Sequence, residues 1–228
     1  MLPTSWHWWL TTDAGLAARV ALGVLFFATL ALVDLLRHGQ NAHRWREYLF
    51  LLVCALAAML YGLINDQITA TISWEYFYYG KGLDQVLGPQ TPPNLAQLHG
   101  HVAKIGLKAS WTVGLIAGVA MLLANNPRKD RPQLPYRTLL RLLPLILTAA
   151  ILAGVVLGLV GRAGGLAWCS ADFPDLIRQD LFRPYRLMTV FGIHLGAYVG
   201  GLLGTLMVVA LILRRRLARS AMKAPDNK

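Results

Sequence analysis

The sequence is poor in charge, and acidic residues are the scarcest charged class. Only 14% of the 228 residues are charged, and 11 Asp and Glu stand against 22 Lys and Arg. Soluble domains contain about 25% charged residues. With 56% hydrophobic residues, this composition excludes an ordinary soluble domain and indicates a membrane protein with several spans.

Cysteine and histidine are also scarce. The two cysteines, Cys54 and Cys169, fall at different predicted depths and in no metal-binding or redox spacing, so we expect no disulfide between them. The six histidines form no HExxH or HxxxH box. The chain is therefore unlike the histidine-rich desaturases and hydroxylases of membranes.

Five long apolar runs dominate what is present. A hydrocarbon core about 30 Å thick needs roughly 20 helical residues to cross it, and the backbone must satisfy its own hydrogen bonds there. The runs cover residues 14–36, 48–64, 102–124, 139–160 and 188–213. Helix is expected to continue past residue 64 through 65–71. We predict an all-α polytopic bundle that forms one domain over 1–228, with outer loops at about 65–101 and 161–187.

The basic residues predict the orientation of these spans, because Lys and Arg in short loops stay on the cytoplasmic side. Three segments hold 14 of the 22 basic residues: 37–46, 128–141 and the tail 214–228. The amino terminus should then lie outside and the tail in the cytoplasm, in a bacterial inner membrane. The net charge of +11 follows from this topology, with lipid headgroups as partners. No nucleic-acid binding is expected.

Glycine recurs every four residues in the last run, at positions 192, 196, 200 and 204. Such a stripe lets a neighbouring helix approach closely. The neighbour can belong to this chain, to a membrane-protein partner or to a second copy in a homo-oligomer. His194 and Tyr198 face away from the stripe, at about 100° per residue.

Ionisable and polar side chains gather in the predicted outer half of the spans. They are Asp66, Gln67, Glu75, His99, His101, Lys104, Lys108 and His194. Ionisable groups inside a membrane are costly, so each invites a functional hypothesis. We expect them to form an outward-facing pocket between the second, third and fifth spans.

Metal binding fits this set chemically. Carboxylate oxygens and imidazole nitrogens suit zinc, iron or manganese. Asp66, Glu75 and His194 are the expected ligands, joined by His99 or His101, while Tyr76 or Tyr198 supplies a proton. The function predicted is a metal-dependent enzyme or oxidoreductase acting on a small or lipid-like substrate. A haem would need two facing imidazoles at one depth, a requirement that this sequence meets less readily. A quinone site would use the same side chains as the metal site.

Two other classes of function stay open. The same acids, lysines and His194 can form the relay of a proton- or ion-coupled transporter. Alternatively, Asp66 and Glu75 only neutralise Lys104 and Lys108, and the chain is a structural or assembly subunit.

One stretch carries a family resemblance. Tyr61-Gly62, Asn65-Asp66-Gln67-Ile68-Thr69 and Glu75-Tyr76-Phe77 are followed much later by His194, Tyr198 and Gly200-Gly201. This pattern resembles a group of uncharacterised bacterial multi-pass membrane proteins, in which the residue before the Asp is His or Asn. The resemblance implies a shared site on the second and fifth spans and brings no activity with it.

Overall fold

The computed structural model describes residues 13–42, 44–127, 132–172 and 184–221, and these are helical with no strands. The elements are α2 (Asp13–His38), η1 (Gly39–Asn41), α3 (Trp45–Ile72), α4 (Trp74–Tyr78), α5 (Asp84–Leu87), α6 (Leu95–Ala124), α7 (Tyr136–Leu140), α8 (Leu143–Arg162), η2 (Ala167–Asp172) and α10 (Pro184–Ala221).

Five helical stretches in the described residues are long and apolar enough to cross a membrane. They are Ala17–Asn41, Trp45–Ile72, Leu95–Ala124, Tyr136–Arg162 and Pro184–Ser220. This confirms the predicted all-α class and the five spans. The chain has the fold of a multi-pass membrane protein.

The span boundaries agree with the prediction at the end of α3 and differ from it at the start of α6. α3 does continue through the 65–71 stretch, as expected, and ends at Ile72. α6 begins at Leu95, seven residues early, because the Asn94 side chain caps it by accepting hydrogen bonds from the amides of Ala96 and Gln97. Much of the predicted outer loop 65–101 is therefore helix, and His99 lies on the first turns of α6.

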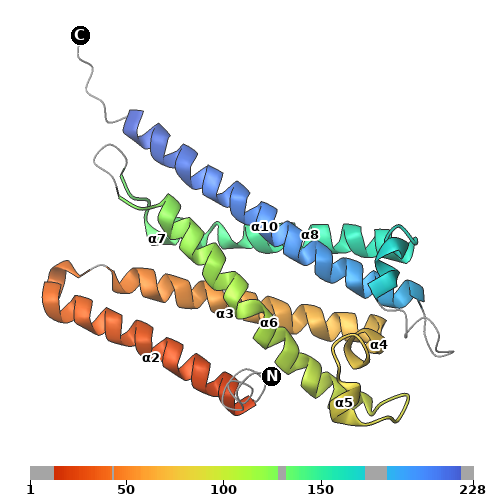
Figure 1. Cartoon of the computed structure of the whole chain (residues 1–228). Helices are drawn as coiled ribbons and strands as arrows, with labels where there is room; N and C mark the ends of the chain where they lie inside the picture. The colour runs from red at the N-terminus through yellow and green to blue at the C-terminus, as the bar shows by residue number, and fades with distance from the viewer. Residues whose placement is uncertain (1–12, 43, 128–131, 173–183, 222–228) are drawn as a thin grey trace.

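The predicted glycine stripe packs α10 against α8, and the two helices lie side by side (Figure 1). A Cβ atom placed on Gly192, Gly196 or Gly200 would overlap a carbonyl oxygen of α8. Close approach at this face is confirmed, and the neighbour is a helix of the same chain. The glycine face is thus covered by α8.

A second glycine contact, not predicted, joins α3 to α6. A Cβ atom on Gly106 would lie 2.6 Å from the carbonyl oxygen of Gly62, far inside van der Waals contact. Small residues recur every four positions along α6, at Gly106, Ser110, Gly114 and Gly118, so the signal was present in the sequence. The bundle therefore contains two tight helix pairs, α3 with α6 and α8 with α10, while α2 packs against α3.

The described basic segments lie at one end of the bundle. The α2–α3 connection, α7 and the end of α10 are at that end, and α4, α5 and η2 are at the other (Figure 1). That this basic end is cytoplasmic stays a prediction. Residues 128–131, 173–183 and 222–228, which belong to the predicted basic loop, outer loop and tail, lie outside the described residues.

Candidate functional site

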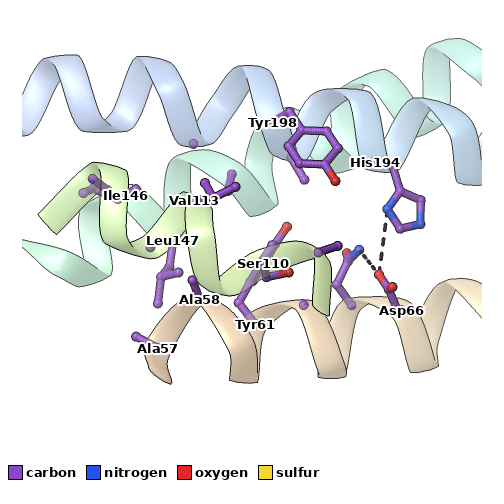
Figure 2. A pocket seen from close by; sticks show the side chains of 18 of the residues that line it. Ala57, Ala58, Tyr61, Asp66, Ser110, Val113, Ile146, Leu147, His194 and Tyr198 are labelled. Atoms are coloured by element: carbon purple, nitrogen blue, oxygen red, sulfur yellow. Dashed lines mark hydrogen bonds and ion pairs between the residues drawn. The ribbon is translucent and has the colours of Figure 1, made fainter. Parts of the chain in front are cut away.

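A pocket lies between the two helix pairs, where α3, α6, α8 and α10 face one another (Figure 2). It holds about 970 Å³ of empty space, counting its open mouth. Its lining comprises Cys54, Ala57, Ala58, Tyr61, Gly62, Asn65, Asp66, Lys81, Ile105, Ala109, Ser110, Val113, Gly114, Ala117, Leu143, Ile146, Leu147, Ala150, His194, Ala197, Tyr198, Gly201 and Thr205.

The lining is polar at one end and largely apolar along the rest. In Figure 2, Asp66 and His194 stand at one end, while Ala57 and Ile146 stand at the other. Asp66 and Cys54, which both line the pocket, are twelve residues apart on α3, or about 18 Å at 1.5 Å per residue. The pocket is therefore long, with its polar groups near the end that carries α4.

The aromatic residues of α4 fix the imidazole of His194. The Tyr76 ring is stacked on it, with ring centroids 4.9 Å apart and planes 7° apart. Phe77 meets it edge-on at 5.9 Å. Only 14% of the His194 side chain is exposed. The imidazole has one orientation because two rings hold it.

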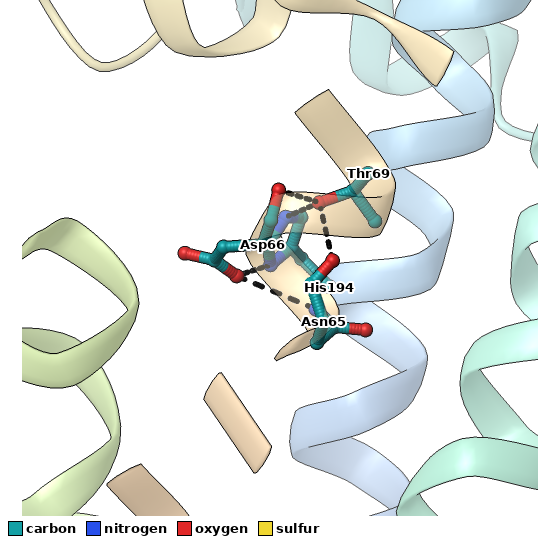
Figure 3. A network of polar contacts seen from close by, with 4 residues as sticks. All are labelled: Asn65, Asp66, Thr69 and His194. Atoms are coloured by element: carbon teal, nitrogen blue, oxygen red, sulfur yellow. Dashed lines mark hydrogen bonds and ion pairs between the residues drawn. The ribbon is translucent and has the colours of Figure 1, made fainter. Parts of the chain in front are cut away.

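Asp66 and Thr69, one turn apart on α3, face the two ring nitrogens (Figure 3). His194 Nδ1 lies 3.8 Å from Asp66 Oδ1, an ion-pair distance beyond ordinary hydrogen-bond length. His194 Nε2 lies 3.4 Å from Thr69 Oγ1. The Asn65 side-chain amide also donates to Asp66 Oδ1, at 3.4 Å. The structure thus joins α3 and α10 through a small polar network.

Tyr76 and Lys81 border this network from the segment that follows α3. Tyr76 is 6% exposed. Its burial, with the neighbouring Tyr198 and Asp66, raises the pKa of the Tyr76 phenol above its usual value. The Lys81 ammonium lies 5.4 Å from the centre of the Tyr76 ring, a cation–π distance. Tyr76 therefore remains a neutral phenol at physiological pH.

Gln67 and His99 form a separate pair that ties α3 to α6. Gln67 Nε2 donates to the His99 carbonyl oxygen at 3.0 Å, and Gln67 Oε1 lies 2.9 Å from His99 Nδ1. Glu75 is buried and accepts a hydrogen bond from Ser73 Oγ at 2.7 Å. These two contacts hold the α3–α4 corner and the start of α6 in place.

Of the five predicted metal ligands, the structure brings Asp66 and His194 together. Glu75 contacts Ser73 and His99 contacts Gln67, and neither lines the pocket. His101, Lys104 and Lys108 lie on α6 outside the pocket lining. Within the described ranges, no three or more His, Cys, Asp and Glu side chains are grouped so as to hold a metal ion. Of the predicted metal ligands, Asp66 and His194 are thus the two that share one place.

Two parts of the site were not predicted. Lys81 reaches the pocket because the chain turns back after α4, a reversal that no sequence period predicts. The small residues that leave the cavity empty, such as Ala57 and Ala58, could have been found from the scarcity of large side chains on that face of α3.

Comparisons with protein-family models, with curated proteins and with solved structures find no match. Function is therefore inferred from the site itself.

Proposed function

We propose that this membrane protein binds a lipid-like molecule in the pocket and exchanges a proton with its polar head at Asp66 and His194. One observation carries the proposal: a long apolar cavity inside the spans ends at a buried carboxylate–imidazole pair. Ligand pockets commonly combine mostly apolar walls with a few placed polar groups.

The placement of Asp66 and His194 favours a ligand over simple helix adhesion. Polar side chains that only join membrane helices point at each other within a packed interface. Here both side chains also line a cavity, so that a bound molecule can reach them. A role in ligand binding therefore explains better why two ionisable side chains are kept inside the membrane despite their energetic cost.

A second groove supports access from the bilayer. It lies between α3 and α8 and is lined almost entirely by apolar side chains, including the exposed Leu60, Ile64 and Val155. Tyr61 and Asn65 line both the groove and the pocket. A hydrophobic molecule dissolved in the membrane can thus reach the pocket sideways.

The proton exchange rests on the imidazole and its neighbours. A histidine between a carboxylate and a hydroxyl, with the phenols of Tyr76 and Tyr198 beside the pocket, has the groups needed for general acid–base catalysis. The predicted metal-dependent reaction is retained as a variant of this proposal, in which substrate or water completes the coordination of an ion at Asp66 and His194.

The experiment compares two valines on α6. Val113 lines the pocket and Val119 does not, although both are about equally exposed, at 42% and 43%. The protein is purified in detergent, and its bound small molecules are extracted and identified by mass spectrometry. We expect a stoichiometric amphiphile in the wild type and in Val119→Trp that is lost in Val113→Trp.

An amphiphile retained in Val113→Trp, or a wild type free of any stoichiometric amphiphile, would contradict the proposal. Elemental analysis of the same samples tests the metal variant, which requires a metal that is lost in both Asp66→Ala and His194→Ala.

A further inference from the structure

We infer that the ligand of the pocket carries an anionic head, a carboxylate or a phosphate, that pairs with Lys81. This inference rests on the proposed function, because it names the class of lipid-like molecule. It follows from counting charges at the polar end of the pocket, where the hydrogen bonds limit how many protons the side chains carry.

The first step is the hydroxyl proton of Thr69. Thr69 Oγ1 donates to the carbonyl oxygen of Asn65 at 2.9 Å, with the Asp66 carbonyl also in reach at 3.2 Å. A hydroxyl has one proton. With that proton engaged, Thr69 Oγ1 can only accept from His194, so His194 Nε2 carries a hydrogen.

The second step concerns the other ring nitrogen. If Nε2 holds the proton of the neutral imidazole, Nδ1 presents a lone pair toward the Asp66 carboxyl group. Two facing acceptors in a buried site are unfavourable, so one further proton lies on either Nδ1 or Asp66. Both arrangements give the pair a net charge of zero.

The third step is the charge that remains. Among the residues that the structure describes, the other titratable groups facing the pair are the phenols of Tyr61 and Tyr76, the Lys81 ammonium and the Tyr198 phenol, while the α6 and α8 residues of the lining include no ionisable side chain. Phenols ionise in water only near about pH 10. Lys81 therefore leaves the polar end with one net positive charge.

A single positive charge at the polar end of a largely apolar pocket is complementary to an amphiphile with an anionic head. The aliphatic stem of a lysine can lie along an apolar surface while its ammonium reaches the polar region, and the contact with the Tyr76 ring places that ammonium. The head would meet Lys81 and donors of the Asp66–His194 network, and the tail would extend toward Val113 and Ile146.

The test uses four amphiphiles with the same C18 chain: oleate, oleyl phosphate, oleyl alcohol and oleylamine. Native mass spectrometry of the detergent-purified protein measures their binding, and only binding lost in Val113→Trp is assigned to the pocket. We expect the two anions to bind about tenfold or more tightly than the alcohol, as charge-assisted contacts do. The preference between oleate and oleyl phosphate identifies the head.

Lys81 variants then separate charge from shape. Lys81→Gln should bring the anions down to the affinity of the alcohol, and Lys81→Arg should keep the preference. Lys104→Gln, which removes a charge on α6 outside the pocket lining, should leave it unchanged.

The outcomes separate the inference of an anionic head from the proposed function of lipid binding. If the alcohol binds as tightly as the anions, if oleylamine binds best, or if Lys81→Gln keeps the preference, the inference is overturned and the pocket stands. If no amphiphile shows binding sensitive to Val113→Trp, the proposed function itself fails.

Discussion

His194 shows how one side chain can be held by three kinds of contact. Stacking on Tyr76 fixes the plane of the ring, and Thr69 and Asp66 face its two nitrogens. A ring fixed in this way has a defined tautomer, which is an observable property of a single residue.

We expect the neutral His194 ring to carry its proton on Nε2, as ¹⁵N chemical shifts of histidine-labelled protein can show, with His194→Gln identifying the signal. Thr69→Val removes the acceptor and should shift the population toward the Nδ1–H form. Thr71→Val is the control, because Thr71 is exposed and bonds to Ile68 of its own helix. A neutral ring protonated on Nδ1 in the wild type would contradict the charge count, whereas a doubly protonated ring would agree with it.

The phenol of Tyr76 predicts a loss of stability at alkaline pH. Its pKa is raised in the folded protein, mainly by burial, so its contribution to folding is complete below the unfolded pKa of about 10 and is lost as pH rises through the folded value. The midpoint temperature of thermal unfolding in detergent should therefore fall less steeply with pH above about pH 10 in Tyr76→Phe than in the wild type. Equal slopes would show that the phenol is not buried.

Residue chemistry predicted part of this site. Asp66 and His194 were recognisable because ionisable residues inside apolar runs are rare, and the structure does bring them together. The partners of Glu75 and His99 were not predictable, because they depend on the α3–α4 corner and on where α6 begins. The Asn94 cap was a readable signal for that beginning.

At the scale of helices, the close packing of each pair depends on glycines, which have no side chain to separate the two backbones. Gly200 and Gly201 are adjacent on α10, yet a Cβ atom on Gly200 would overlap the α8 backbone, whereas one on Gly201 meets nothing within 4 Å. The repeat of four in α10 predicted its contact, and the similar repeat in α6 was legible as well. The identity of the helix that packs against each glycine repeat could not be predicted, because the spacing of glycines does not specify the partner helix.

Gly200→Ala should lower the free energy of unfolding by about 1–3 kcal/mol, the usual cost of overpacking. Gly201→Ala should change the free energy of unfolding by less than about 1 kcal/mol, because the added methyl group meets no neighbour and alanine has a higher helix propensity than glycine. Unfolding by SDS in mixed micelles, followed by circular dichroism, compares the two variants. Equal effects would mean that α8 and α10 do not pack as the structure has them.

The end of α6 depends on one residue of α10. Arg216 is 2% exposed and donates to the carbonyl oxygens of Ala124 at 2.5 Å, Asn126 at 2.6 Å and Pro132 at 3.2 Å. These bonds satisfy acceptors that the helix end leaves open. The guanidinium therefore ties the α6–α7 connection to α10.

We predict that Arg216→Leu destabilises the protein by about 2–3 kcal/mol, since hydrogen bonds to charged groups contribute that much. Arg215→Leu, an exposed position on the same helix, serves as the matched control in the same SDS titration. A similar loss in both variants would assign the effect to overall charge.

For the whole molecule, composition and hydropathy predicted the five spans and the all-α class correctly. They also placed the basic segments at one end of the bundle, as the described parts of those segments show (Figure 1). The sequence could predict these features because the length of apolar spans and the placement of basic loops are both set by the lipid bilayer. A pocket between the second, third and fifth spans was predicted, but the part that α8 plays in its lining and its apolar length were not, since they arise from the gap between two helix pairs.

The predicted orientation can be measured directly in bacteria. A fluorescent protein fused to the carboxyl terminus should fold and fluoresce, and alkaline phosphatase at the same position should be inactive, because the basic end is expected in the cytoplasm. The opposite pattern would invert the bundle and place the polar end of the pocket on the cytoplasmic side.

Each helix pair is held by backbone touching backbone, whereas the two pairs meet around an empty space. Around the pocket the two pairs are consequently packed less closely against each other than the helices are within each pair. Rocking one pair against the other would widen or narrow the gap between α3 and α8 without repacking either glycine contact. A bound molecule would fill this gap and add contacts between the two pairs that the glycine faces do not supply.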